Sequence, residues 1–211
     1  TREFMAELRE RSTPSAVVLA AGEGSFLYLL GEAIRRFVRK AEQPLRLLTR
    51  DREGTLAALR SGEAQLGVAA LDALPDDLES EVLCEVPQVL VMPADHPLAK
   101  RRKISPSDLA GARLIVAPAG RPHRAMLDTT LLAAGVRWEV AVETHGWPAM
   151  LQFVKLGVGL AVVNGSVKLA RGLVGRPIPT LPTTRYFLVH PKRIGAGAAS
   201  LAGLIVDHVG S

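Results

Sequence analysis

Two guanidinium groups and an imidazole lie in one short loop, between Gly120 and the start of a predicted helix. The loop contributes Arg121, His123 and Arg124. A helix N-terminus carries partial positive charge and normally favours acidic residues, so these cations are mildly unfavourable there. A bound anion, or the carboxylate of Glu23 if it faces this loop, would relieve them. The alternative is a solvated loop with no ligand.

A second loop of the same kind precedes the next predicted helix and contains Thr144, His145, Trp147 and Pro148. Proline at a first helical position marks the helix start. The indole of Trp147 offers a large apolar surface with one polar edge, which suits an aromatic contact with a ligand. Packing on the base of the helix would explain Trp147 equally well.

The first half of the chain has two comparable loops, which hold Glu23, Gly24 and Ser25 in one and Asp51 and Arg52 in the other. The Ser25 hydroxyl can cap a helix, bind a ligand or do both. Asp51 is more simply a helix cap, and Arg52 is more simply solvated. All five residues remain candidates for a binding site.

Asn164 and Gly165 follow the apolar run of residues 160–163. A turn with positive φ, which both residue types favour, is the simpler interpretation of this pair. Contact of Asn164 with a ligand is the alternative.

Motifs that indicate catalysis are absent from the sequence. The five histidines show no metal-ligand spacing and have no cysteine companion. Gly22 and Gly24 lack the third glycine of a dinucleotide fingerprint, and there is neither a phosphate loop nor a nucleophile elbow. We therefore expect no catalytic residue, no metal site and no cofactor, and we expect that the protein is not an enzyme.

Strands and helices alternate along the chain, which predicts an α/β fold with parallel sheets and right-handed crossovers. The expected strands are residues 17–21, 45–49, 66–70, 82–86, 89–92, 114–117, 139–143, 160–163 and 186–189. The expected helices are residues 26–40, 55–60, 123–134, 147–156, 166–170 and 198–209. These elements form two small doubly wound units.

Composition limits the possible partners. The formal net charge is +5, but the only dense basic run, residues 100–103, has no aromatic neighbours to stack on bases, so a solvated loop is favoured over a nucleic-acid site. A lone cysteine, Cys84, cannot form an internal disulfide and indicates a reducing compartment. There is no signal peptide and no membrane-spanning run, so we expect a cytoplasmic protein with no membrane partner.

The middle of the chain leaves one sheet and begins a second unit. The apolar run that ends at Met92 stops at Pro93 and Pro97, which cannot donate to a strand ladder. His96 between them is expected to hold the turn. Ser105 then begins a short helix, with Asp108 three residues later as an acidic capping box.

This middle stretch resembles the crossover of the effector-binding domain of LysR-type transcriptional regulators, on the residues Pro-x-Asp-His-Pro-Leu-Ala, the capped helix and the strand that follows. The run from Lys155 to Val163 is similar to a second signature of that family. The two motifs occur in the family's order, and the resemblance extends from Val17 to about His208.

The resemblance implies a type II periplasmic-binding-protein-like fold, with two Rossmann-like subdomains joined by a two-strand hinge. Residues 1–12 would end a linker helix, residues 13–92 and 186–211 would form subdomain I, and residues 93–185 would form subdomain II. The hinge would include Met92, Pro93 and Arg185. The candidate loops above would then line an effector site in the interdomain cleft.

The resemblance also implies partners. A small-molecule effector, to which the cationic loop adds the suggestion of an anion, would bind in the cleft. Two copies would form a homodimer, with a tetramer as the further expectation for the full-length protein. Operator DNA would be bound through an N-terminal helix-turn-helix domain that this sequence lacks. A solute-binding protein of a transporter, with the same fold, is the alternative, and a two-lobed biosynthetic enzyme is a second one.

Overall fold

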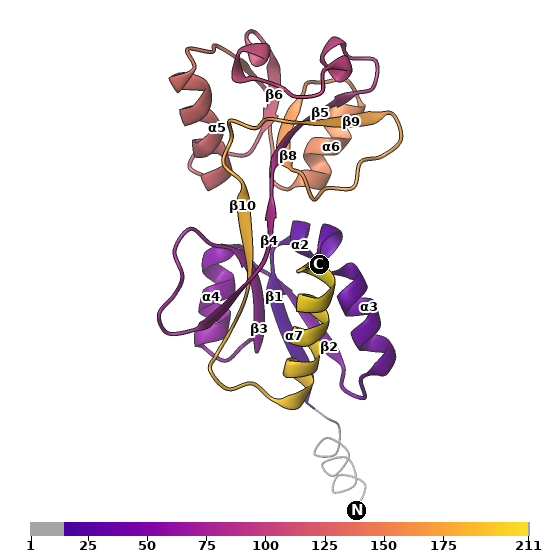
Figure 1. Ribbon diagram of the computed structural model, residues 1–211, viewed down its shortest axis with the longest axis vertical. Helices are drawn as coiled ribbons and strands as arrows, with labels where there is room; N and C mark the ends of the chain where they lie inside the picture. The colour runs from indigo at the N-terminus through magenta and orange to yellow at the C-terminus, as the bar shows by residue number, and fades with distance from the viewer. Residues whose placement is uncertain (1–14, 211) are drawn as a thin grey trace, which may run out of the picture. The chain divides into compact units, whose positions relative to one another are not determined.

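The computed structural model describes residues 15–210 and divides the chain into two compact units (Figure 1). Unit 1 extends to Cys84 and resumes at Arg185, and unit 2 comprises the residues between, Glu85–Thr184. The predicted end of a linker helix, residues 1–12, lies outside the described residues. The chain therefore passes between the units twice.

The two passages differ in position from the predicted boundaries. The first lies inside strand β4 (Glu79–Val86), and the second lies near the start of strand β10 (Thr184–His190). Strand β5 (Gln88–Pro93), which we expected to complete the first unit, belongs to unit 2. It was misassigned because an apolar strand does not reveal its pairing partner, and β5 pairs with two strands of unit 2.

The sheet of unit 1 has the order β2-β1-β3-β10-β4. Strand β1 (Val17–Ala21) pairs in parallel with β2 (Leu45–Thr49) and β3 (Leu66–Ala70), as predicted. Strand β10 is antiparallel to β3, so the expectation of an entirely parallel sheet is wrong. The chain returns from unit 2 at that point and needs no crossover helix before β10.

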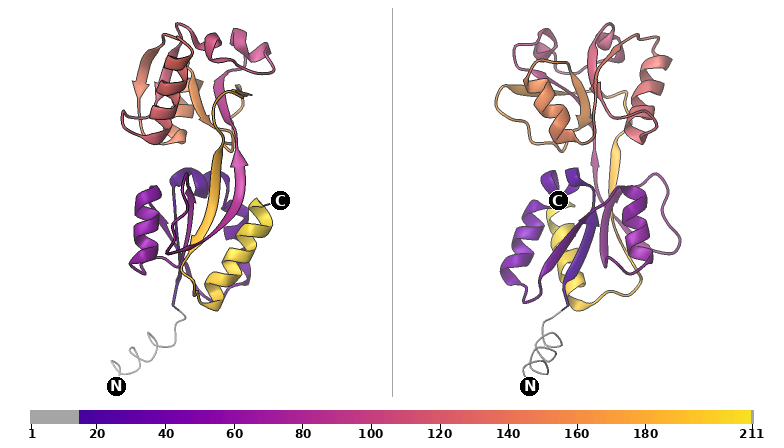
Figure 2. Two further views of the ribbon diagram at one scale, coloured as in Figure 1. Left: turned by 60° about the vertical axis from the view of Figure 1, so that its left-hand side comes forward. Right: turned by 180° about the vertical axis from the view of Figure 1, so that it is seen from behind.

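Strand β1 is buried along its whole length, because helices cover both faces of the unit 1 sheet. Val17, Leu19 and Ala21 pack with α3 (Gly31–Lys40) and α7 (Ala196–Val209). Val18 and Ala20 face the opposite way and pack with α4 (Arg52–Arg60). Figure 2 shows α4 on the other side of this sheet from α3 and α7. Alternate residues of one strand thus serve two cores, which explains the continuous apolar run.

The predicted helix of residues 26–40 is two helices, α2 (Glu23–Tyr28) and α3. The break lies at Leu29 and Leu30, whose N–H groups both donate to the Ser25 carbonyl, at 3.0 and 2.9 Å. Gly31, a poor helix former, follows directly. Leu30 and Phe37 are nevertheless fully buried, so the segment still turns an apolar face to the core.

Unit 2 contains a three-stranded sheet of order β8-β5-β9 and a parallel pair formed by β6 (Arg113–Val116) and β7 (Glu139–Glu143). A parallel bridge from Leu114 to Leu160 connects the pair to β8 (Ala161–Asn164). Strand β5 is antiparallel to both β8 and β9 (Leu173–Pro177). This sheet is therefore also mixed rather than parallel.

Strand β9 falls in a Gly- and Pro-rich stretch, residues 172–182, in which we expected no strand. It is tolerated as an edge strand, where Pro177 withholds no needed N–H group. Gly175 lets the side chain of Leu169 approach within 3.3 Å of where a Cβ would lie. The helix predicted for residues 166–170 is wrong: the segment is a turn followed by chain without regular secondary structure.

Two longer helices and two short 3-10 helices complete unit 2. Leu127 and Leu131 of α5 (Pro122–Ala133) pack in the core beside Leu109, while α6 (Trp147–Lys155) packs against β5, β6 and β8. The short helices are η1 (Pro97–Lys100) and η2 (Pro106–Leu109). The acidic capping box is confirmed, because the Asp108 carboxylate accepts a hydrogen bond from the Ser105 N–H at 2.8 Å.

Within residues 15–210, no helix has the length and apolar character that a bilayer crossing would require.

Candidate functional site

Three candidate loops of unit 2 meet at one edge of its sheet. Strands β6, β7 and β8 run parallel, so the loops at their carboxyl ends lie side by side. The N–H of Thr144, in the second loop, donates to the carbonyl of Val116 at the end of β6, at 2.9 Å. In parallel α/β sheets ligands bind at such an edge, where loops lead into helix N-termini.

His123 and Trp147 are in direct contact at this edge. Their ring centroids lie 4.7 Å apart with the planes at 71°, an edge-to-face arrangement. Each side chain stands in the first turn of its helix, His123 in α5 and Trp147 in α6. The contact therefore connects two of the predicted loops.

Burial keeps His123 neutral. Desolvation lowers its pKa from 6.5 to about 4, since no nearby anion compensates for removing an imidazolium from water. Its Nε2 is covered and has no hydrogen-bond partner among the described residues. The imidazole is thus a neutral hydrogen-bonding group and not one of the cations that the sequence suggested.

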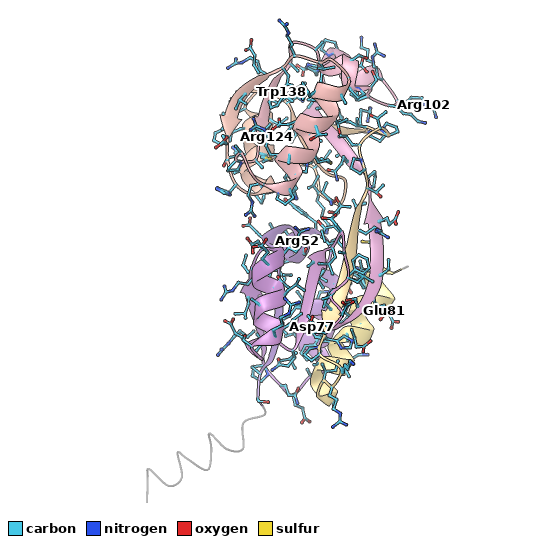
Figure 3. All side chains as sticks on the ribbon, turned by 90° about the vertical axis from the view of Figure 1, so that its left-hand side faces the viewer. Arg52, Asp77, Glu81, Arg102, Arg124 and Trp138 are labelled. Atoms are coloured by element: carbon cyan, nitrogen blue, oxygen red, sulfur yellow. The ribbon has the colours of Figure 1, made fainter. Side chains whose placement is uncertain are left out.

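Arg124 has a structural task that we missed. Its Nε donates to the Asp128 carboxylate at 2.9 Å, and its guanidinium donates to the carbonyl of Ala117 at 3.3 Å. It also lies 5.1 Å from the centre of the Trp138 ring, and Figure 3 shows the two side chains close together. A carboxylate four residues later on the same helix, at Asp128, was the signal for this pairing.

A further ion pair extends the anchoring of Arg124. Its guanidinium lies 3.7 Å from the Glu143 carboxylate, at the end of β7. Because Ala117 follows β6 and Glu143 ends β7, one side chain joins the first turn of α5 to both strand ends. Arg124 therefore fixes the loops instead of offering a charge to a ligand.

The remaining members of these loops are more accessible. Arg121 is the N-cap residue of α5 and is exposed, as is His145, while Thr144 is partly buried. Gly120 and Gly146 have φ of 84° and 77°, which side-chain-bearing residues rarely adopt. These two glycines let each loop turn sharply into its helix.

Asn164 is fully buried at the end of β8, and its side-chain oxygen accepts a hydrogen bond from the Ser166 N–H at 2.9 Å. The expectation of a positive φ is wrong, because Gly165 lies outside the set of glycines with positive φ. A Cβ at Gly165 would lie 2.9 Å from the Pro87 carbonyl oxygen, so close backbone approach explains this glycine.

Gln88 is a polar neighbour of Asn164 that sequence reasoning missed. The two residues are paired across β5 and β8, and Gln88 is 1% exposed. Its Nε2 donates to the Thr184 hydroxyl at 2.9 Å, whereas its Oε1 has no partner within residues 15–210. A glutamine at the start of an otherwise apolar strand was the sequence feature that could have indicated this buried polar residue.

The candidate loops of unit 1 also share an edge, since β1 and β2 are parallel neighbours and the Arg50 N–H donates to the Ala21 carbonyl at 3.0 Å. Asp51 is a helix cap, accepting from the Gly54 N–H at 3.0 Å. Arg52 is not simply solvated: it pairs with Asp72 at 2.7 Å.

The first loop of unit 1 leads into the short helix α2. Gly22 is the N-cap residue, so the structure does not place Ser25 at the cap. Ser25 is buried inside the helix, Gly24 is partly buried and Glu23 is exposed in the first turn. Burial, followed by the charge of Glu23, raises the pKa of Tyr28.

The predicted hinge residues lie in different places. Met92 and Pro93 pair with β9 inside unit 2, so they stand away from both passages between the units. Arg185 is the first residue of unit 1 after the second passage, and its carbonyl accepts a hydrogen bond from the Leu71 N–H at 3.3 Å. Within residues 15–210, no group of three acidic, His or Cys residues could hold a metal ion.

Comparison with known proteins identifies relatives. Residues 11–208 match the model of a family described as the LysR substrate binding domain. The HTH-type transcriptional regulator CbbR of Xanthobacter flavus is 32% identical over 164 residues, covering 74% of this chain and 48% of that protein. The HTH-type transcriptional regulator CatR of Pseudomonas putida is 32% identical over 149 residues, covering 68% and 50%. The chain spans about half the length of these relatives.

Solved structures support the same fold. The regulatory domain of CcmR from Synechocystis PCC6803, solved in complex with 2-PG, matches with a TM-score of 0.79 at 19% identity, covering 93% of this chain and 98% of that one. The reduced form of the OxyR regulatory domain from Pseudomonas aeruginosa matches with a TM-score of 0.77 at 20% identity, covering 93% and 95%. The predicted type II periplasmic-binding-protein-like fold is confirmed, and by the match over residues 11–208 this chain belongs to the LysR substrate-binding domain family.

Proposed function

We propose that this chain is the ligand-sensing part of a LysR-type transcriptional regulator, and that a small-molecule effector binds at the carboxyl edge of the unit 2 sheet. The family match over residues 11–208 carries the proposal. The meeting of three loops at one edge, with His123, Trp147 and Asn164 at their helix or strand ends, supports the place. The contribution of the unit 1 loops to the same effector site stays a prediction.

The geometry supports an effector with an apolar or aromatic body and a polar group. Trp147 offers the apolar contact, and His123 has a covered, neutral Nε2 without a protein partner among the described residues, which an effector would have to expose in order to bind it. An anionic effector was suggested by three residues, but His123 is neutral and Arg124 is engaged by Asp128. If the effector carries an anionic group, we propose that Arg121 holds it.

The regulatory consequence follows from linkage. An effector shifts a conformational equilibrium only by its differential affinity for the two arrangements.

We propose that the protein works in the cytoplasm as a homodimer, with operator DNA bound by a part of the protein outside these 211 residues. Relatives such as CbbR are regulators, which favours this function over a transporter component or an enzyme. Sedimentation that finds only monomer at micromolar concentration would contradict the homodimer.

A thermal-shift screen tests the site. The panel contains small carboxylates, aromatic acids and amino acids, because a ligand at about 100 times its dissociation constant stabilises the folded state by about 2.7 kcal/mol. We expect a compound whose shift is lost in Trp147→Ala and reduced in His123→Phe. Arg102→Gln, which changes an exposed side chain outside the site, serves as the control. A shift that persists in both site variants would contradict the proposed place.

A further inference from the structure

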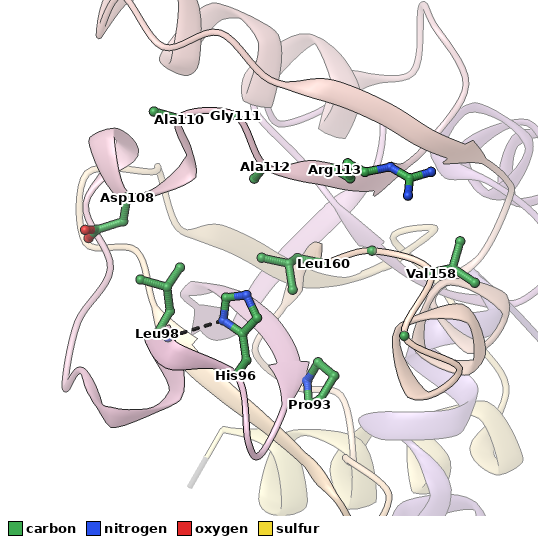
Figure 4. Close-up of a pocket in the computed structure, with 12 residues that line it drawn as sticks. Pro93, His96, Leu98, Asp108, Ala110, Gly111, Ala112, Arg113, Val158 and Leu160 are labelled. Carbon is green, nitrogen blue, oxygen red and sulfur yellow. Dashed lines mark hydrogen bonds between the residues drawn. The ribbon is translucent and has the colours of Figure 1, made fainter.

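Unit 2 contains a hollow at the opposite edge of its sheet from the candidate loops. It has a volume of about 440 Å³ and lies where β5 ends and where β6 and β8 begin (Figure 4). Pockets of about 300–1,000 Å³ are typical of small-molecule sites. The proposed effector site lies at the carboxyl ends of β6, β7 and β8, so the two places are distinct within one unit.

The walls of the hollow are largely apolar side chains and bare backbone. Pro93, Leu98, Val158 and Leu160 supply the apolar part. Gly111 is among the glycines that line it, with a φ of 71° and nothing within 4 Å of the position that a Cβ would occupy. Because these glycines have no side chains, the space of the hollow stays open.

His96 presents a fixed hydrogen-bond donor to this hollow. Its Nδ1 accepts a hydrogen bond from the Leu98 N–H at 3.2 Å, so the neutral ring carries its proton on Nε2. Figure 4 shows this bond on one side of the imidazole, with the opposite side of the ring facing the hollow. The expectation that His96 holds the turn is thereby confirmed, and the ring retains a second nitrogen for a ligand.

Arg113 contributes a positive charge at the rim. It forms no ion pair with any residue from 15 to 210, although Glu139 stands opposite it across β6 and β7. The other charged lining residue, Asp108, is already engaged: it accepts from Ser105 and lies 3.3 Å from the Arg101 guanidinium. Its carboxylate turns away from the hollow in Figure 4.

We propose that this hollow is a second ligand site for a small organic monoanion, whose carboxylate accepts from the Nε2–H of His96 and whose apolar body lies against Leu98 and Leu160. The exposed Arg113 side chain, which extends toward Val158 in Figure 4, would turn toward His96 to pair with the same carboxylate. A cation with no ion pair in the described part of the chain and one directed donor, both beside apolar walls, match a carboxylate on a compact hydrocarbon. The site uses none of the residues of the proposed effector site. Its failure in a test would leave the proposed function unaffected, and the reverse also holds.

The test is a nuclear magnetic resonance titration of the 211-residue chain with cyclohexanecarboxylate as the probe. We expect progressive shifts of the amide signals of Leu98, Gly111 and Gly159, which line this hollow. Cyclohexanecarboxamide has nearly the same shape without the charge, and we expect it to bind about tenfold more weakly or worse, as loss of a charge-assisted hydrogen bond implies.

Matched variants complete the test. His96→Asn keeps a side-chain acceptor for the Leu98 N–H but removes the Nε2 donor, and Arg113→Gln removes the charge. Each should raise the dissociation constant about tenfold. Arg102→Gln removes the same charge from an exposed position outside the hollow and should change nothing; Figure 3 shows this side chain projecting outward. The proposal is overturned by unshifted amides, by equal affinity for the carboxamide, or by unchanged affinity in both site variants.

Discussion

The imidazole of His123 meets the indole of Trp147 edge to face, with centroids 4.7 Å apart. The two residues are far apart in sequence, but each occupies the first turn of the helix that follows one of two parallel strands. The contact buries the imidazole at a helix N-terminus, where a positive charge is doubly unfavourable. Protonation of His123 should therefore disturb the ring contact that shapes the candidate site.

Stability should fall between pH 7 and pH 5 because of His123. The folded-state pKa is about 4 and the unfolded value is 6.5, so within this window the unfolded chain binds more protons than the folded one. The contribution of the neutral His123 to the free energy of unfolding is fully present above about pH 6.5 and is lost as the pH falls toward 4. We expect a loss of about 2 kcal/mol between pH 7 and pH 5, measured by urea unfolding.

His123→Phe supplies the control for this pH dependence, because phenylalanine keeps a ring at the contact but does not titrate. The variant should lose most of the difference between the two pH values. Carboxylates such as Asp108, whose pKa is lowered by the Ser105 backbone, act only below about pH 4 and do not enter this window. An equally steep pH dependence in the variant would show that another group is responsible.

The ring contact itself should be measurable as a coupling energy. Trp147→Leu and His123→Leu, alone and together, form a double-mutant cycle, and we expect an interaction of about 0.5–1.5 kcal/mol at pH 7. The measurement is the free energy of unfolding of the four proteins. Additive effects, with no interaction beyond error, would mean that the two rings are neighbours without stabilising each other.

Arg124→Lys should destabilise unit 2 although it preserves the charge. The side chain of Arg124 is 14% exposed, and its guanidinium contacts Asp128, the Ala117 carbonyl and Glu143 together, which an ammonium group cannot reproduce. We expect a loss of about 1–2 kcal/mol in chemical unfolding. Arg52→Lys changes an exposed ion pair with Asp72 and should lie within about 0.5 kcal/mol of the parent.

Gly165→Ala and Gly203→Ala should have opposite effects. A Cβ at position 165 would lie 2.9 Å from the Pro87 carbonyl oxygen, a backbone atom that cannot easily move, so a loss of about 1–3 kcal/mol is expected. Gly203 lies within α7 with nothing within 4 Å of the added atom, so alanine should stabilise the helix by about 0.5–1 kcal/mol. Thermal unfolding of both variants tests the pair, and stabilisation by Gly165→Ala would refute the proposed close approach.

Local pattern determined most elements of this protein. The strand of residues 17–21 was predicted at its observed bounds because an apolar run with turn residues at both ends depends on nearby sequence alone. The acidic cap at Asp108 and the turn at His96 were equally local. The family resemblance, which rested on the run of residues around that turn, was confirmed by a match over residues 11–208.

Only the tertiary structure decided which strands pair. Strand β5 belongs to unit 2 and β10 runs antiparallel to β3, because pairing depends on where the chain returns in space and not on the residues of one strand. The same applies to the site: His123 is neutral and Arg124 is anchored because of Trp147, Asp128 and the strand ends around them. Sequence named the residue types that could bind a ligand, whereas burial and long-range contacts set the charge and the partners of each.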